Sequence, residues 1–340
     1  MKLIELHILQ SFPVSCLNRD DVGSPKTAVF GGVQRARLSS QCLKRAARVA
    51  ASESAPGFEG IRSRFLKGPF TEALLNAGVE AEKASALAQA ICETFSKQDA
   101  KHEAQVTTAV YLAPSEIKQV AEAVAKGEDP KKAAKKVDRL DAADIAFFGR
   151  MIANDATLNV EGAAMFSHAL STHKATNEID FYSAVDDRKA DSEDAGAGMI
   201  GTLEFTSATY YRYAAVNLDL LFSECHLGKL SEAERKAVLR VFIEATLTSV
   251  PGARKNSMNA ATLPFEVLGI FKSKGQPIQL INAFECPVQA NGKGLATTSL
   301  EALRAELAKL KKTWGIEQEE AWLTEVGIQS FLEKLTSHVE

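Results

Sequence analysis

The sequence predicts an α+β fold in which a ferredoxin-like sheet is split by a long helical insertion. Three observations support this fold. The chain opens with a strand of period two, followed by a loop and a helix. Alanine-rich helical segments then fill residues 58–185. Strand, helix and strand patterns return over residues 202–295, the order that a split β-α-β sheet requires.

The first element is a strand over residues 2–9, in which apolar and polar side chains alternate. A loop rich in Pro and Gly follows over residues 11–32. A helix is predicted to begin at Ser40 and to run to about Ser52, where a Pro-Gly pair soon ends the pattern.

The insertion should contain three main helices, over residues 71–97, 115–126 and 130–151. An acidic, glycine-spaced stretch over residues 186–201 has too few apolar side chains to form a core. We therefore interpret it as an excursion from the domain.

The second half of the sheet begins with a strand over residues 202–216. A capping box at Ser231 opens an amphipathic helix that ends near Pro251. Further strands are predicted over residues 262–271 and 278–284, and two helices should finish the chain.

Charge is distributed unevenly along the chain. The net charge is −3, yet the first fifty residues carry eight cationic against three acidic side chains. A local cationic excess on an otherwise acidic protein is typical of a polyanion site. We find no transmembrane segment or signal peptide, and the five scattered cysteines suggest reduced thiols in the cytoplasm.

The helix after Ser40 carries the sharpest pattern. Gln41, Lys44, Arg45 and Arg48 fall within an arc of about 100° on a helical wheel. The arc holds no carboxylate, so its cations repel one another unless an anion lies between them. This favours phosphate binding over a merely solvated face.

Residues that precede this helix extend the predicted site. Ser39 and Ser40 leave free amides at the positive end of the helix dipole, which is a natural phosphate seat. Arg35 and Arg37 alternate with apolar residues, so both should leave the same side of an extended segment.

An enzymatic alternative remains open. Asp20 and Asp21 lie beside cations and could hold Mg²⁺ for phosphodiester cleavage. Sequential aspartates usually point apart, and no third carboxylate is spaced to join them, so we favour a role in ordering the loop. His168 and His173 have no zinc-like spacing to other ligands.

Nine ordered blocks of the sequence resemble one known family, the backbone subunit of the type I-E CRISPR Cascade complex (the CasC family). The blocks are CLNRDD (16–21), FGG (30–32), RARLSSQCLKR (35–45), GAAM (162–165), HALSTHK (168–174), DFYSAVDD (180–187), GTLEF (201–205), YRYA (211–214) and VPGAR (250–254).

The resemblance implies a hand-like protein that is a scaffold and not an enzyme, with no cofactor. Its RNA-recognition-type palm would comprise residues 1–57 and 202–295, its helical fingers residues 58–185, and its thumb hairpin residues 186–201. Helices over residues 296–340 would complete it. Copies would stack along the guide RNA beside other Cascade subunits, and would leave bases free to pair with target DNA.

The resemblance also implies which residues meet RNA. Phosphates would be bound by the palm, and Met165 would contact a base. The thumb would contribute two residues of its returning strand, and Arg254 ends the last matching block. The full set, with the two arginines before the helix, is Arg19, Lys26, Arg35, Arg37, Ser39, Gln41, Lys44, Arg45, Arg48, Met165, Ile200, Thr202 and Arg254.

Overall fold

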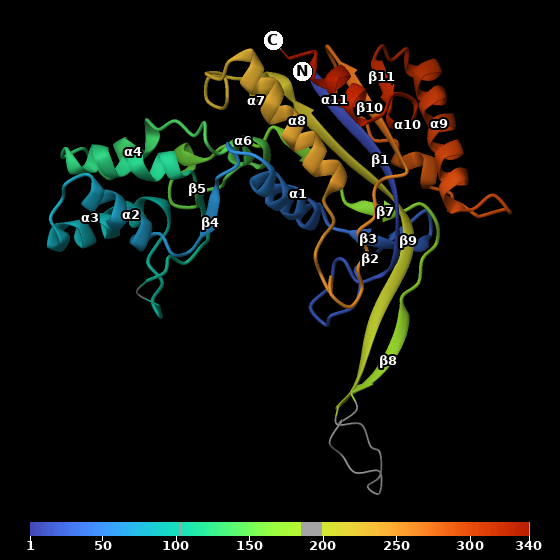
Figure 1. The fold of residues 1–340 in the computed structure, drawn as a ribbon, viewed down its shortest axis with the longest axis horizontal. Helices are drawn as coiled ribbons and strands as arrows, with labels where there is room; N and C mark the ends of the chain where they lie inside the picture. The colour runs from blue at the N-terminus through green and yellow to red at the C-terminus, as the bar shows by residue number, and fades with distance from the viewer. Residues whose placement is uncertain (103, 185–198, 340) are drawn as a thin grey trace, which may run out of the picture.

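A large antiparallel sheet organises the protein, with a helical part to one side and a long hairpin that projects away from both (Figure 1). The computed structural model describes residues 1–340 except 103, 185–198 and 340. The predicted α+β class is confirmed. The predicted thumb stretch, 186–201, lies almost wholly outside the described residues.

Nine strands of the described chain form this sheet, in the order β11-β10-β1-β9-β7-β3-β2, and β6 and β8 also pair with β9. The strands are β1 (Leu3–Ser15), β2 (Thr27–Phe30), β3 (Val33–Leu38), β6 (Ala164–Phe166), β7 (Ala169–Ser171), β8 (Glu178–Ala184), β9 (Met199–Asn217), β10 (Glu266–Lys272) and β11 (Glu319–Trp322).

Helices cover both faces of the sheet. A separate group, α2 to α6, forms the helical part together with β4 (Ile61–Ser63) and β5 (Val110–Leu112). The helices are α1 (Ser40–Ser54), α2 (Lys67–Asn76), α3 (Ala81–Phe95), α4 (Pro114–Ala125), α5 (Pro130–Lys135), α6 (Ala143–Phe148), α7 (Leu218–Leu221), α8 (Glu232–Thr248), α9 (Leu295–Trp314), α10 (Leu323–Val326) and α11 (Ile328–Thr336).

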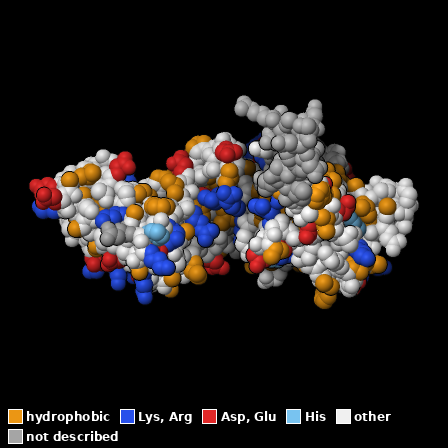
Figure 2. All heavy atoms as spheres, turned by 90° about the horizontal axis from the view of Figure 1, so that it is seen from below, with side chains coloured by type: hydrophobic (Ala, Val, Ile, Leu, Met, Phe, Trp, Pro, Cys, Tyr) orange, Lys and Arg blue, Asp and Glu red, His pale blue; other side chains and the backbone are white. Residues whose placement is uncertain are grey.

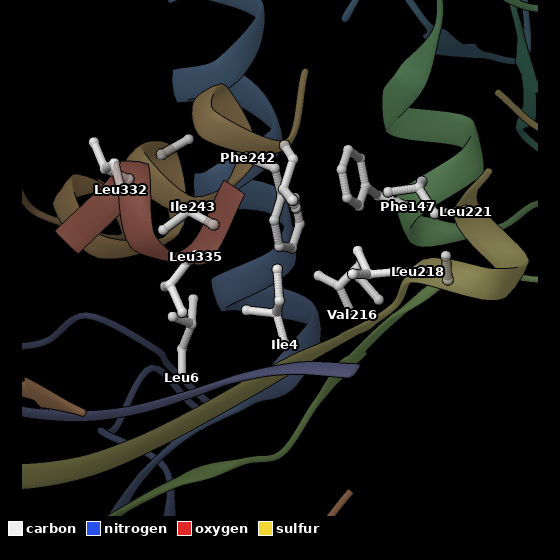
Figure 3. Packing of buried hydrophobic residues seen from close by; sticks show 14 of the residues in the cluster. Ile4, Leu6, Phe147, Val216, Leu218, Leu221, Phe242, Ile243, Leu332 and Leu335 are labelled. Carbon is white, nitrogen blue, oxygen red and sulfur yellow. The ribbon is translucent and has the colours of Figure 1, made fainter. Parts of the chain in front are cut away.

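The main core lies between the sheet and α8. Ile4 of β1 points toward Phe242 of α8, and Leu6 points toward Leu335 of α11, as Figure 3 shows. Phe147 of α6 stacks on Phe242 with ring centroids 4.0 Å apart. This contact packs the helical part directly against the core of the sheet.

The opposite face of β1 is buried as well, under α9. Glu5 and His7 are both fully buried there. Lys272 of β10 forms an ion pair with Glu5, with 2.8 Å between the nitrogen and the oxygen. The opening strand therefore has two buried faces, and its polar side chains find partners on the neighbouring strands, Glu5 on β10 and His7 on β9.

Several predicted elements need correction. The helix predicted over 71–97 is two helices, α2 and α3, because Gly78 between them adopts φ +87°. The segment 278–284 contains a 3₁₀ turn, Ile281–Phe284, in place of a strand. Part of the predicted loop 11–32 is strand: β1 runs to Ser15, and β2 pairs with β3.

The predicted boundaries also change. Strands β6 and β7 come from the predicted insertion, 58–185, yet they pair with β9 in the large sheet. The predicted helical tail, 296–340, contributes β11, which pairs with β10. Among the described residues, no helix is both long and apolar enough to cross a membrane.

Candidate nucleic-acid interface

The helix α1 is held at its first turn by contacts from three segments. Ser39 is the N-cap, and its hydroxyl accepts from the backbone N–H of Cys42. The side chain of Asn18 accepts from the N–H of Ser39 at 2.8 Å, and Nδ1 of His168 accepts from the N–H of Ser40 at 3.1 Å. These contacts fix the direction of α1 relative to the sheet.

The same contacts correct the predicted phosphate seat. The amides of Ser40 and Cys42 already donate to protein acceptors, and Ser39 is largely buried. Phosphate binding by α1 would therefore rest mainly on its side chains. Leu43, which begins the buried face of α1, points away from them.

The cations of α1 divide between two sides. Lys44 Nζ lies 5.8 Å from the centre of the Phe166 ring, and Arg48 lies 5.4 Å from the centre of the Tyr111 ring. Burial lowers the pKa of Lys44. Arg45 is exposed and faces the N-terminal loop instead. The predicted arc thus exists, but its two edges have different surroundings.

The helical part holds Arg48 in place through a buried carboxyl group. Tyr111 of β5 donates its hydroxyl hydrogen to Asp144 of α6, and the N–H of Gly60 also donates to Asp144. Burial raises the pKa of Asp144, while the hydrogen bond from Tyr111 and the charge of Arg48 oppose this shift. The orientation of Arg48 therefore depends on residues far along the chain.

A groove of about 1080 Å³ lies beside α1. Its walls are α1, the loop of residues 17–23, and the loop of residues 249–261 with Thr248 at the end of α8. Arg19, Arg45 and Lys255 line it, together with Asp20 and other acidic side chains. Both loops contain blocks that carry the family resemblance, and the fold brings them together in one groove beside α1.

The pKa values of two thiols reflect the charges around this groove. Burial raises the pKa of Cys16, and the charges of Arg254 and Arg19 oppose that shift. Burial likewise raises the pKa of Cys42, against the charges of Lys26 and Arg45. Four of the predicted RNA contacts, from three segments, therefore lie close enough to these thiols to affect their pKa values. Figure 2 shows Lys and Arg side chains gathered in the middle of this face.

The loop of residues 249–261 is fastened at both ends by one buried pair, Gln10 and Arg212. The guanidinium of Arg212 donates to the carbonyl of Thr246, near the end of α8, and to the side chain of Gln10. Gln10 in turn donates to the carbonyl of Thr262 at 2.6 Å. Within the loop, Arg254 adopts φ +53°, and its buried Nε has no hydrogen-bond partner among the residues that the structure describes.

Arg35 is not available to RNA, and this prediction is wrong. Its side chain is fully buried, and its guanidinium donates to carbonyl oxygens of Ser171, Thr172 and Phe284. Arg35 instead connects β3 to the end of β7 and to the turn at Phe284. Arg37 is half-buried, and its Nε donates to the carbonyl of Thr27.

Within the acidic pair of the N-terminal loop, Asp20 orders that loop, as the sequence suggested. One carboxylate oxygen of Asp20 accepts from the N–H groups of Val22 and Ser24, at 3.1 and 2.9 Å. Asp21 is exposed beside it. Within the described residues, no group of three or more His, Cys, Asp or Glu side chains is placed to hold a metal ion.

The remaining predicted contacts lie apart from α1. Met165 is half-buried and packs with residues under α9, whereas its neighbour Phe166 faces α1. Thr202 is exposed on the hairpin, where it pairs with Phe181 of β8. Ile200 lies on the same strand, and its backbone pairs with Ser183. The fold therefore separates the predicted contacts in the sheet and α1 from those on the β8–β9 hairpin.

Sequence reasoning missed three residues at this site: Asn18, His168 and Tyr111. Asn18 and His168 stand in matching blocks, but nothing local showed that both reach the first turn of α1. Tyr111 lies 63 positions after Arg48, and only the packing of the helical part reveals their contact.

Comparison with known proteins agrees with this geometry. The model of the family described as "CT1975-like protein" matches residues 4–340. A solved structure titled "CRISPR RNA-guided surveillance complex, pre-nicking" is similar, with 29% sequence identity, a TM-score of 0.79, and coverage of 94% of this chain and 91% of that chain.

A second structure, titled "CRISPR RNA-guided surveillance complex", shares the fold. It has 23% identity, a TM-score of 0.64, and coverage of 98% of both chains. No curated protein sequence gives a significant match. Because the family model spans nearly the whole chain, this protein belongs to the CT1975-like protein family.

Proposed function

We propose that this chain is the guide-RNA-binding backbone subunit of a type I-E CRISPR Cascade surveillance complex. Copies of it polymerise along the spacer, beside other Cascade subunits, and present the bases for pairing with target DNA. The chain is a binding subunit and not an enzyme. The family match and the titles of the similar structures support the assignment to such a complex.

One observation carries the RNA-binding role: exposed and half-buried cations from three segments converge on α1. Arg45 and Arg19 line the groove on one side of the helix, and Lys44 and Arg48 lie over aromatic rings on the other. Cations without base-stacking platforms bind a phosphate backbone in any sequence, as a guide-RNA scaffold requires.

The strand order supports a ferredoxin-like palm. Strand β1 lies between β10 and β9, and β9 is followed by β6 and β7, all in antiparallel pairs. The helix α1 follows the first strands and packs beside α8, which precedes β10. This strand order and the positions of the two helices support a split β-α-β unit that is repeated twice.

The test measures RNA affinity against salt for the double variant Arg19→Ala with Arg45→Ala. Both side chains are exposed, so the fold should survive. Affinity should fall similarly for RNAs of different sequence, and the slope of log affinity against log salt should flatten by about 1.4, about 0.7 for each phosphate contact.

The matched control removes two exposed cations of the helical part, Lys83 and Lys118, which pair with glutamates on their own helices. That variant should keep the affinity and slope of the wild type. If both double variants bind as tightly as the wild type, the cations of α1 are only solvated and the proposal fails.

Polymerisation has its own test, the pattern of RNA protected from nuclease by the purified protein. A ladder with a regular step indicates repeated copies. Deletion of residues 191–198, within the predicted thumb, should leave the monomer folded and abolish the regular ladder. An unchanged ladder would contradict the thumb assignment.

A further inference from the structure

We propose that Cys225 is an activated thiol and a site of covalent modification by small disulfides. It lies outside the RNA interface, on the turn between α7 and α8, where that turn meets the helical part. The protein has five cysteines; Cys16 and Cys92 are buried, Cys42 is half-buried, and Cys225 and Cys286 are exposed. The inference does not depend on the proposed function.

Cys225 has a base within reach. Its sulfur lies 3.2 Å from Nδ1 of His226. The other ring nitrogen, Nε2, lies 2.7 Å from the carbonyl oxygen of Glu161, which can only accept. Nε2 therefore carries the hydrogen in the neutral ring, and Nδ1 is a free acceptor.

Of the two side chains beside Nδ1, only the thiol has a hydrogen to donate to it. Ser223 is the other neighbour of Nδ1, also at 3.2 Å, but its hydroxyl donates to the carbonyl of Leu220 at 2.7 Å. A hydroxyl has one hydrogen, so Ser223 cannot also donate to His226. The thiol also lies 3.2 Å from the hydroxyl oxygen of Ser223, but of the two side chains beside Nδ1 only Cys225 can donate to it. This is the arrangement of a nucleophilic thiol with its general base.

The surroundings leave space for a small adduct. Cys225 and His226 line a cavity of about 160 Å³, and its opposite wall is formed by residues 135–146 of the helical part. Water occupies about 30 Å³ per molecule in the liquid, so the cavity holds a group of about five heavy atoms. A disulfide of a two- or three-carbon thiol fits this space.

The reaction is a thiol–disulfide exchange. The sulfur of Cys225 attacks one sulfur of the disulfide while its proton moves to Nδ1 of His226. The disulfide bond breaks, a mixed disulfide forms on Cys225, and the leaving thiolate takes a proton from the imidazolium. The disulfide is the oxidant, and one free thiol is released for each adduct.

The modified cysteine would stand at the joint between the sheet and the helical part. Four residues further on, Lys229 forms an ion pair with Asp138, with both carboxylate oxygens within 2.8 Å of its nitrogen. An adduct in the cavity presses on the segment that holds Asp138. Modification should therefore also loosen this ion pair.

The experiment follows the release of thiol from hydroxyethyl disulfide by the whole folded protein. One thiol should react about tenfold faster than the rest, and Cys225→Ser should remove this phase while Cys286→Ser keeps it. His226→Asn should slow the phase about tenfold, whereas Ser223→Ala should keep it. The number of thiols that react in each variant shows whether it is folded, because buried thiols react only on unfolding.

Equal rates for Cys225 and Cys286, or a fast phase that survives both His226→Asn and His226→Gln, would overturn the proposal. Loss of RNA binding in the variants of α1 would not affect this result, so the two proposals fail separately.

Discussion

His7 should make the protein sensitive to mild acid, and His7→Gln should remove much of that sensitivity. The imidazole is fully buried beneath α9, where its Nδ1 lies 2.8 Å from the hydroxyl of Tyr211. That hydroxyl accepts from the N–H of Leu280, so its own hydrogen points to His7. The charged groups that face the ring are Glu5, at 4.0 Å, and Lys272.

Burial, and then the charge of Lys272, lower the pKa of His7 from 6.5 to about 3. The neutral ring is thus favoured in the folded state. Its contribution to stability is complete above pH 6.5 and is lost as the pH falls toward 3. Each pH unit within this window removes about 1.4 kcal/mol, so about 3 kcal/mol is lost between pH 6 and pH 4.

The measurement is urea unfolding at several pH values, followed by circular dichroism. The wild type should lose about 3 kcal/mol more than His7→Gln between pH 6 and pH 4, although the variant is less stable at neutral pH. His102→Gln, an exposed change in the helical part, should follow the wild type. Parallel curves for the wild type and His7→Gln would refute the reasoning, because they would mean that the ring is solvated or charged in the folded state.

Two further predictions concern the β2–β3 hairpin and the loop of residues 17–23. A Cβ at Gly31 would meet the carbonyl oxygen of Glu285 at 1.7 Å, whereas one at Gly32 meets nothing, and both glycines have positive φ. Gly31→Ala should therefore destabilise the protein by at least about 2 kcal/mol more than Gly32→Ala, as measured by thermal unfolding. Asp20→Ala with Asp21→Ala should leave any nuclease activity of purified samples unchanged; Mg²⁺-dependent RNA cleavage that disappears in this variant would favour the ribonuclease alternative.

Local patterns were sufficient where they followed one element. The alternation of the first strand, the start of α1 at Ser40 and the capping box at Ser231 are all confirmed, because each depends on neighbours in the sequence. The cationic arc of α1 is also real. What surrounds it was not predictable, because Phe166 and Tyr111 arrive from distant segments.

The failures have the same cause. Arg35 lies in an extended segment with the spacing of an exposed residue, but the carbonyls that bury it belong to β7 and to the turn at Phe284. The strands β6 and β11 are short, so their extended conformation depends more on pairing with β9 and β10 than on their own composition. The burial of Glu5 and His7 could not be predicted from the first strand either, because α9, which covers them, lies near the end of the chain.

The strand β9 joins two environments in one unbroken run of 19 residues. Its second half is paired on both sides in the buried sheet. Within the described part of the chain, its first half pairs with β8 alone, where Ile179 and Phe181 are 71% and 63% exposed. Backbone amides should therefore exchange with deuterium at rates that fall steadily along this strand, from the hairpin toward Tyr211. A step between two plateaus would instead reveal a hinge, and the hairpin would then move as a separate unit. A steady gradient would mean that the core sets the direction of the hairpin.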